Sequence, residues 1–412
     1  MDAFWRYCFR QQLAPSDAAC TRRRAKITIK KVASGAIAKG ARGQKYLQSQ
    51  PEGSPQCCVG CTHHWRHMHD IAIYIGRFQP VHSGHLALLQ RALASAAQVI
   101  VVVGSAWQAR SPKNPFTWQE REAMLRAALP AADRARVRVL PMRDCYNEAV
   151  WANAVRAAVA GLAPEGARIG LVGHFKDATS SYLRAFPDWD LINVGRQGSI
   201  DATAVRDAYF GAAAGQALQA LAPLAAQIPP GTRVALEVFA DTPAYAALQE
   251  EWRMLRGYRA AWAAAPYPPV FVTVDAVLRC QDQILLIRRA HAPGKGQLAV
   301  PGGFIEQRET LWQSCLRELA EETHCKLPEA TMRAALQAVA VFDHPDRSQR
   351  GRTITHAHYF DLGNTALPHL TADDDAQEAL WVPIDALGGR EEEFFEDHFH
   401  MLDHFLGLRL QP

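Results

Sequence analysis

The sequence has no apolar stretch that approaches the ~20 residues needed to cross a bilayer, so it predicts no membrane segment. Cysteine is also scarce, with 9 in 412 residues, and five of these lie in the first 67. The few that remain cannot form a disulfide framework, which favours a reducing, cytoplasmic setting. The start of the chain has basic residues but lacks the apolar segment of a secretory signal.

What the chain does have is the composition of a globular protein, with 49% hydrophobic and 21% charged residues, and enough length for two or three domains. Its net charge of +4 is unevenly spread. Residues 1–67 hold twelve Lys/Arg and three Asp/Glu, a balance of +9, and the remainder carries −5. Because residues 1–67 lack periodicity and are rich in polar residues, we predict a disordered basic extension. Aromatic residues are few and no nucleic-acid-binding motif appears, so we expect no specific nucleic-acid partner.

The cysteines of this extension allow two interpretations. Cys57, Cys58 and Cys61, with several histidines nearby, could hold a soft metal ion. However, their spacing is not that of a standard zinc module, and the surrounding sequence offers no core to support one. The alternative is an upstream extension of little function, in which case Met68 is the true start.

From Asp70 onward, short apolar runs alternate with helical segments. Such runs are typical of buried parallel strands, and strand–helix alternation predicts a doubly wound sheet. We therefore expect an α/β, Rossmann-like domain over residues 68–240, followed by a helical linker over 241–266. The strands are expected at 71–75, 98–104, 137–140, 169–173 and 191–194.

Residues 267–412 have a different pattern. Two strands meet at a turn near Gln281, a loop rich in Gly and Pro follows, and a helix is expected from Thr310 to Glu322. Further strands are expected afterwards. This mixture predicts a second domain, an α/β/α sandwich built on a mixed sheet.

The segment 76–85, Gly-Arg-Phe-Gln-Pro-Val-His-Ser-Gly-His, lies between the first strand and a helix. Ligands of open α/β sheets bind at the carboxyl ends of the strands, and a helix N-terminus offers free N–H groups to phosphate. His82 and His85 could donate to phosphate oxygens and stabilise developing charge. A surface turn with two solvated histidines is the alternative, but the strand–turn–helix context favours a phosphate site.

This segment resembles the nucleotidylyltransferase superfamily with its (His/Thr)-x-Gly-His signature and, more narrowly, the nicotinamide-mononucleotide (NMN) adenylyltransferases. Further matches lie at 114–121, 144–151, 173–177 and 200–206. The resemblance implies transfer of the adenylyl group of ATP to NMN, which gives NAD and pyrophosphate with the help of Mg²⁺. It implies that His82, His85, Lys176 and Arg206 are catalytic. The substrate-binding residues it implies are Gly76, Arg77, Phe78, Gln79, Asn114, Arg121, Tyr146, Asn147, Trp151, Asp177 and Thr203.

Asp201 departs from this family, which usually has Ser at that position. A carboxylate beside a triphosphate should repel it. Because Asp and Ser are equally good helix N-caps, we predict that Asp201 mainly caps the helix that starts there.

A second constellation is an acidic helix. Glu318, Glu321 and Glu322 stand at i, i+3 and i+4, where like charges on one helix face repel and a divalent cation would relieve the repulsion. A solvated acidic face is the alternative. The spacing of Gly303, Glu309 and Arg317 before these glutamates favours the metal site.

The second pattern resembles the Nudix box. The resemblance implies that Glu318, Glu321 and Glu322 hold Mg²⁺, which Mn²⁺ could replace, and that Glu318 and Glu321 are catalytic. His324 stands where the family has Gly, near a helix end that often needs a positive φ. His tolerates that region better than most residues.

Residues 342–353 look like the corresponding segment of ADP-ribose pyrophosphatases. Arg347, Arg350 and Arg352 are candidates for the diphosphate or the terminal ribose, and the alternative is a solvated basic loop. Together the two resemblances are those of a bifunctional enzyme that makes NAD and also hydrolyses ADP-ribose to AMP and ribose 5-phosphate. Other interpretations remain open: the transferase could act on another phosphate acceptor, and the Nudix domain could act on a different nucleoside diphosphate or serve as a ligand-sensing regulatory domain. The sequence leaves homo-oligomerisation and the choice between nicotinamide and nicotinate mononucleotide open.

Overall fold

A computed structural model describes residues 69–173, 178–195, 200–373 and 375–408. The predicted basic extension, with its cysteines, lies outside these ranges. Within the described ranges, no helix is both long enough and apolar enough to cross a membrane.

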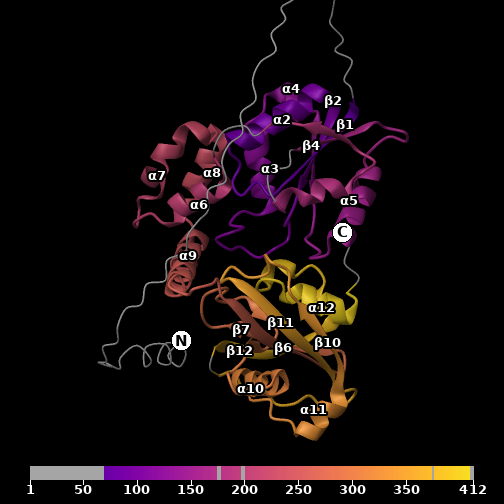
Figure 1. Ribbon diagram of the computed structural model, residues 1–412, viewed down its shortest axis with the longest axis vertical. Coiled ribbons are helices and arrows are strands. Elements are labelled where there is room, and N and C mark those ends of the chain that lie inside the picture. Colours follow the sequence, from indigo (N-terminus) through magenta and orange to yellow (C-terminus); the bar gives the residue numbers. More distant parts are fainter. Residues whose placement is uncertain (1–68, 174–177, 196–199, 374, 409–412) are drawn as a thin grey trace, which may run out of the picture. The chain divides into compact units, whose positions relative to one another are not determined.

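The first half of the described chain is built on a five-stranded parallel sheet with the order β3-β2-β1-β4-β5 (Figure 1). Its strands are β1 (His69–Gly76), β2 (Ala96–Val103), β3 (Val137–Pro141), β4 (Ile169–Gly173) and β5 (Asp190–Asn193). The order reverses direction beside β1, so the carboxyl ends of β1 and β4 flank a topological switch point, where open α/β sheets bind ligands. The predicted doubly wound fold is confirmed.

Side chains that alternate along β1 supply the cores on both faces of this sheet. Ile71 and Ile73 pack on one face with α5, whereas Ala72 and Tyr74 pack on the other face with α2 and α3. This two-sided burial explains why the strand is apolar without interruption. The helices of this half before β5 are α2 (Ser83–Ser95), α3 (Trp118–Ala127), α4 (Ala131–Arg134), α5 (Glu148–Ala160) and the 3₁₀ helix η1 (Ala178–Ala185).

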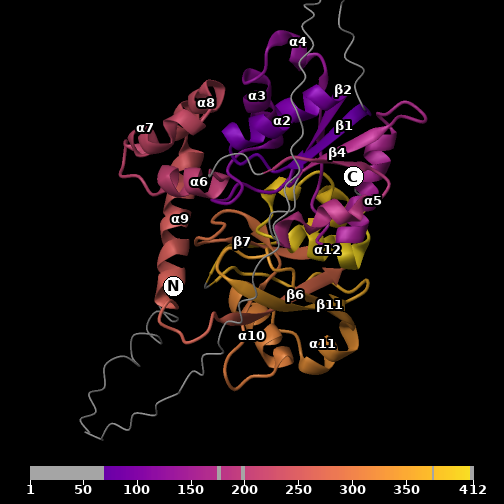
Figure 2. The same ribbon diagram turned by 45° about the horizontal axis from the view of Figure 1, so that its top comes forward.

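A group of helices follows the sheet (Figure 2). These are α6 (Ala202–Phe210), α7 (Ala217–Ala220), the 3₁₀ helix η2 (Ala222–Gln227), α8 (Pro230–Ala240) and α9 (Pro243–Ala261). Pro243 occupies the first turn of α9, where the missing N–H has no cost, and the hydroxyl of Thr242 accepts a hydrogen bond from the Tyr245 N–H at 3.2 Å.

The second half is built on a mixed sheet with the order β10-β11-β6-β7-β12, to which β8 and β9 are added. The β11–β6 pair is parallel and the other pairs are antiparallel. Its strands are β6 (Val270–Cys280), β7 (Gln283–Arg289), β8 (Leu298–Ala299), β9 (Gly302–Phe304), β10 (Leu336–Phe342), β11 (Arg352–Asp361) and β12 (Ala376–Pro383).

Helices cover both faces of this second sheet. Val274, Ala276 and Leu278 pack on the side of α10, whereas Val277 and Leu286 pack on the side of α12. This confirms the predicted α/β/α sandwich with a mixed sheet. The helices of this half are α10 (Leu311–Thr323), α11 (Glu329–Ala335) and α12 (His398–Leu406), with the 3₁₀ helices η3 (Ile384–Leu387) and η4 (Glu391–Glu393).

The two unusual helix ends behave as expected. Asp201 is the N-cap of α6, and its carboxylate accepts a hydrogen bond from the Ala204 N–H at 2.8 Å. His324 ends α10 in the left-handed region with φ 51°. Both departures from the family motifs therefore keep the local backbone geometry that the motifs require.

Candidate functional site

The loop after β1 is shaped by close packing. A Cβ on Gly76 would lie 2.8 Å from the Phe78 ring, so that position needs glycine. Phe78 itself has φ 54° and is 1% exposed. The buried Gln79 amide donates to the Phe116 carbonyl at 2.8 Å, and its oxygen accepts from the Phe116 N–H at 3.0 Å. The side chains of Phe78 and Gln79 thus fix the loop against the 114–117 segment.

His82 and His85 lie together at the start of α2. Their rings stack with centroids 3.7 Å apart, and Nδ1 of His85 accepts the His82 backbone N–H at 3.3 Å. Burial, and secondarily the neighbouring His82, hold the pKa of His85 well below its usual range. The ring is therefore neutral at pH 7, and because Nδ1 is an acceptor, the proton is on Nε2. His85 can therefore donate a hydrogen bond from Nε2 to a phosphate oxygen as a neutral ring, without a positive charge of its own.

Arg77, which directly follows β1, interacts electrostatically with two other cations, Arg206 and Lys113. Arg206 donates to the Gln79 carbonyl at 2.7 Å and to the Thr203 hydroxyl at 3.0 Å. Burial and the nearby charge of Arg77 lower the pKa of Arg206 to about 10. The same two causes lower the pKa of Lys113. Mutual repulsion of cations held close together is what a polyphosphate would relieve.

The sequence analysis did not predict Lys113 as a residue of this site. The available signal was a basic residue directly before Asn114-Pro115, in the segment that resembles the family's acceptor loop.

Arg121 and Asn114 are buried beside the strand ends. Arg121 is 0% exposed and donates to the carbonyls of Arg77 at 2.8 Å, Gly104 at 2.7 Å and Ser105 at 3.0 Å. Its guanidinium therefore joins the ends of β1 and β2, which favours a positioning role over contact with substrate. Asn114 donates to the Gln108 side chain at 2.7 Å, while its Oδ1, among the described residues, has no hydrogen-bond partner.

Trp151 and Asn147, which the resemblance implies as substrate-binding residues, have different surroundings. Trp151 packs edge-on against Tyr182, with centroids 6.1 Å apart, and against Phe186 at 6.0 Å. Asn147 caps α5 by accepting the Val150 N–H at 3.1 Å.

Tyr146 has φ 48°, and its ring contacts two histidines of the second half of the chain. The centroid distances are 5.2 Å to His344 and 4.9 Å to His400. The structure thus places Tyr146 where the two halves meet. Lys176 and Asp177, also expected in the transferase site, lie outside the described residues and stay predictions.

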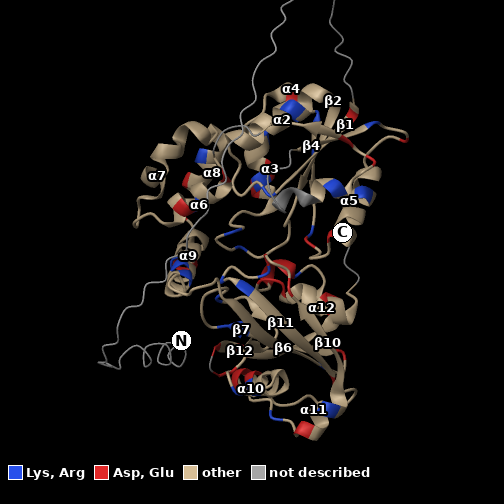
Figure 3. Ribbon diagram, in the orientation of Figure 1, with Lys and Arg blue, Asp and Glu red and all other residues tan. Residues whose placement is uncertain are grey.

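Figure 3 shows acidic residues in red on helix α10. This helix meets the tight loop before it at two glycines, Gly302 and Gly303. Glu322 is 2% exposed and accepts the Gly302 N–H at 2.9 Å. A Cβ on Gly302 would lie 2.3 Å from the Val274 carbonyl oxygen, so glycine is needed there. Gly303 lies directly against the Glu318 carboxyl. Burial, with the charge of Glu318 in addition, raises the pKa of Glu322 well above its ordinary range.

Arg317 connects the remaining acids. It pairs with Glu309 at 2.9 Å, and its Nη1 lies 2.9 Å from both Glu318 Oε1 and Glu321 Oε2. In the described part of the chain, no three acidic, His or Cys side chains already stand close enough to hold a metal ion. The donor set nevertheless suits a hard divalent cation, because such an ion would remove the penalty of ionising the buried Glu322.

The predicted arginines are placed differently from one another. Arg347 is 4% exposed and forms a two-pronged ion pair with Asp397, both contacts at 2.8 Å. These two hydrogen bonds give the Arg347 guanidinium a structural role in the fold. Arg352 pairs with Asp343 at 3.7 Å. Arg350 lies over the Phe304 ring, 5.2 Å from its centroid, and 3.8 Å from Glu396.

Arg289 was not expected from the sequence. Its guanidinium lies 4.3 Å from the centroid of Phe395, and the Arg350 guanidinium lies 5.8 Å from the same ring. Burial and the charge of Arg350 lower the pKa of Arg289, whereas Glu322 acts in the opposite direction. Arg289 therefore lies near both Arg350 and Glu322 of the acidic helix. The signal for Arg289 in the sequence was a basic pair at the end of a strand, Arg288-Arg289.

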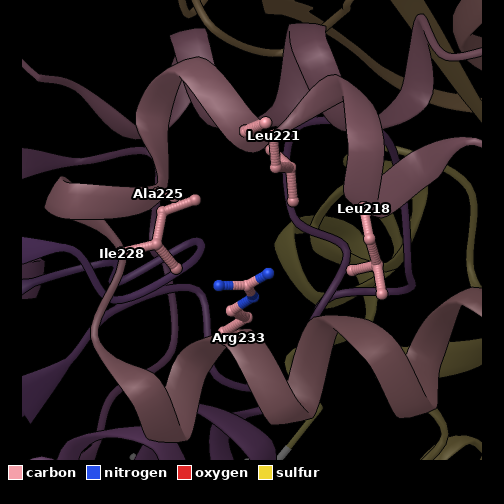
Figure 4. Close-up of a pocket in the computed structure, with 6 residues that line it drawn as sticks. Leu218, Leu221, Ala225, Ile228 and Arg233 are labelled. Atoms are coloured by element: carbon pink, nitrogen blue, oxygen red, sulfur yellow. The ribbon is translucent and has the colours of Figure 1, made fainter.

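A small cavity lies apart from these residues, among α7, η2 and α8 (Figure 4). Its volume is about 10 Å³, close to the minimum for one water molecule. Its lining is mostly apolar and belongs to the helical group rather than to either phosphate-facing loop. It is no candidate for a substrate pocket.

The geometry defines a nucleotidyltransferase joined to a Nudix hydrolase. Family models match accordingly: cytidylyltransferase-like over residues 73–210 and NUDIX domain over 269–405. The bifunctional NMN adenylyltransferase/ADP ribose pyrophosphatase of Francisella tularensis is 35% identical, with a TM-score of 0.76 over 83% of this chain and 99% of that one. The chain belongs to this family of bifunctional enzymes, so the resemblance found in the sequence is confirmed.

Two further comparisons agree. The Francisella tularensis structure complexed with AMP and a Mn ion is also 35% identical, with a TM-score of 0.74 over 82% of this chain and 99% of that one. The nicotinamide/nicotinic acid mononucleotide adenylyltransferase of Acinetobacter baylyi is 36% identical over 185 residues, 45% of this chain and 94% of that protein.

Proposed function

We propose that this enzyme transfers the adenylyl group of ATP to NMN, giving NAD and pyrophosphate, and hydrolyses ADP-ribose to AMP and ribose 5-phosphate with Mg²⁺. The observation that carries the transferase assignment is the stacked pair of His82 and His85 at the start of α2, in which Nδ1 of His85 accepts the His82 N–H. The Francisella tularensis enzyme, whose name states both activities, supports the substrates. The predicted cytoplasmic location is kept as part of this proposal.

In the transfer, a phosphate oxygen of NMN attacks the α-phosphorus of ATP, and the bond to the bridging oxygen of the leaving pyrophosphate breaks. This displacement needs no covalent intermediate on the protein. It needs alignment of the two nucleotides and neutralisation of the developing charge. We assign hydrogen-bond donation to His85 and His82, and charge neutralisation to Arg206 and Lys113. Lys176 and Asp177 remain proposed parts of this site.

In the hydrolysis, water adds to one phosphorus of the diphosphate and the anhydride bond breaks. Glu318, Glu321 and Glu322 would hold a divalent cation, which offsets phosphate charge and activates water when bound. Arg317 holds the carboxylates of Glu318 and Glu321 in place. Arg289, which interacts with Glu322, and its neighbour Arg350 would bind the diphosphate.

The alternative functions have less support. The Nudix acids are present and folded into the loop–helix unit, whereas a ligand-sensing domain could dispense with them. Nicotinamide mononucleotide as the acceptor is supported by Trp151, a partly buried aromatic side chain of a kind that can stack on a pyridine ring.

The two activities can be tested separately. We expect the full chain with Mg²⁺ to form NAD and pyrophosphate from NMN and ATP, and AMP and ribose 5-phosphate from ADP-ribose, each identified by chromatography. Replacing Mg²⁺ with Mn²⁺ and adding a chelator tests the metal. Failure to form NAD, or hydrolysis that persists in excess chelator, would contradict the corresponding half of the proposal.

A further inference from the structure

Helix α9 lies between the two ranges that the family models match, yet it contacts both halves of the chain. On the transferase side, Gln249 donates to the Ala212 carbonyl at 2.9 Å and Trp252 donates to the Asp207 carboxylate at 3.1 Å. Figure 2 shows α9 as a long helix that leaves the α6–α8 group. The helix also contacts loops of the hydrolase half.

Glu251 is a buried carboxylate in the middle of α9, 8% exposed. One of its oxygens accepts the backbone N–H of Gly294 at 3.0 Å. Burial raises the pKa of Glu251 to about 7; nearby Glu396 adds to this rise, and the Gly294 hydrogen bond and Arg289 oppose it. Burying a carboxylate costs free energy unless the group is well paired. Glu251 accepts this one hydrogen bond from the loop backbone, which makes it a candidate for positioning that loop.

The loop backbone at Gly294 is connected to Arg289 by a hydrogen bond of the preceding residue. Gly294 has φ +74°, and a Cβ there would lie 2.3 Å from the Phe395 ring, so the loop is pressed tightly against its surroundings. Nε of Arg289 donates to the carbonyl of Pro293, the residue before Gly294, at 2.9 Å. The Arg289 guanidinium stands over Phe395 and interacts electrostatically with Glu322. Contacts therefore run from Glu251 through the loop backbone to a cation beside the acidic helix.

The same helix reaches a second loop of the hydrolase half. Arg259 donates from Nε and Nη2 to the Gln349 carbonyl, at 3.0 and 2.6 Å. The Gln349 N–H donates to Glu396 at 3.2 Å, and Glu396 pairs with Arg350 at 3.8 Å. Thus α9 contacts the backbone close to both Arg289 and Arg350.

We propose that Glu251 is a positioning residue for ADP-ribose hydrolysis: it fixes the 290–297 loop so that Arg289 faces the diphosphate. The hydrolase site then extends beyond the Nudix fold onto α9. This inference rests on the proposed hydrolysis of ADP-ribose and adds a requirement for a residue that lies outside the Nudix match.

The test compares Glu251→Ala, which removes the acceptor, with Glu251→Gln, which keeps an oxygen acceptor without the charge. Glu250→Ala is the matched control, because Glu250 is the exposed neighbour on the same helix. We expect Glu251→Ala to raise KM for ADP-ribose about tenfold, with a smaller change in kcat, as loss of a hydrogen bond to a charged group would do. Glu251→Gln should stay close to wild type, and Glu250→Ala should match it.

NAD formation by the same preparations serves as the folding control and should be unchanged. If Glu251→Ala loses both activities, Glu251→Asp is tested instead. Asp keeps the charge, but its shorter side chain moves the carboxylate away from the Gly294 N–H, so the same rise in KM is expected. Wild-type KM in the Ala or Asp variant, or a Gln variant as impaired as Ala, would overturn the inference. A wild-type enzyme that releases no AMP from ADP-ribose would instead overturn the proposed function.

Discussion

The carboxylate of Glu322 accepts the backbone N–H of Gly302 at 2.9 Å, which connects helix α10 to the glycine loop before it. Glu322 is 2% exposed, and burial raises its pKa well above the ordinary 4.5. Without a cation the ionised form is disfavoured, so a divalent ion would take the place of the proton. This one contact therefore links metal binding, pH and the stability of the hydrolase half.

Glu322→Gln should stabilise the metal-free protein at neutral pH and abolish efficient hydrolysis. A carboxyl whose pKa is raised on folding contributes full stability below pH 4.5 and loses it progressively as the pH rises. A neutral Gln escapes that loss, so the variant should melt higher than wild type at pH 7 and equally at pH 4 in chelator. ADP-ribose hydrolysis should fall by orders of magnitude. Superimposable curves of hydrolysis against Mg²⁺ for the two proteins would show that Glu322 is not a metal ligand.

His85→Ala should separate the two activities. It removes the Nε2 donor, and loss of one such donor typically costs about 10²–10³ in rate. We expect NAD formation to fall by that order, while ADP-ribose hydrolysis in the same preparation stays at the wild-type level. A parallel loss of both activities in a protein with unchanged thermal unfolding would contradict the assignment of two separate sites.

Arg347→Ala should act mainly on stability. Breaking a buried ion pair leaves Asp397 charged and unpaired, at a cost of about 3–5 kcal/mol. Arg352→Ala, the matched control on the same segment, removes a more exposed pair worth about 0–1 kcal/mol. Denaturant unfolding should show this contrast. If Arg347→Ala keeps wild-type stability but raises KM for ADP-ribose, direct substrate contact by Arg347 is the better explanation.

Asp201→Ser tests whether the cap also affects ATP. The two residues cap helices nearly equally, so stability should change by less than about 0.5 kcal/mol. The negative charge of Asp201 acts to raise the pKa of Arg206, so it neutralises part of the positive charge that Arg206 would present to ATP. Removing it should lower KM for ATP and leave hydrolysis unchanged. Identical ATP kinetics in the two proteins would limit Asp201 to capping.

Local patterns in the sequence predicted the elements well. The apolar runs became the parallel strands, and the Glu318–Glu321–Glu322 spacing marked one face of α10. The helix expected after the first strand is α2, which starts at Ser83 because His82 occupies the N-cap. Side-chain alternation, capping and turn chemistry act over a few residues, so the sequence alone reveals them.

The roles of individual basic residues depended on contacts that the sequence does not reveal. Arg121 was expected to bind substrate, but long-range folding surrounds it with backbone carbonyls. Arg347 pairs with a residue 50 positions away. Lys113 and Arg289 were missed because a basic residue in a loop or at the end of a strand has no periodic signal.

Taken by itself, the sequence determined the two folds, the family and the motif residues, because local periodicity and motif spacing encode them. The tertiary structure decided which charged groups are desolvated and what each one faces. Glu251 shows the difference: in the sequence it is one of two adjacent glutamates in a helix, and only folding brings it to Gly294, 43 residues away. Burial and long-range pairing set the energy of a charge, and neither is a property of its sequence neighbours.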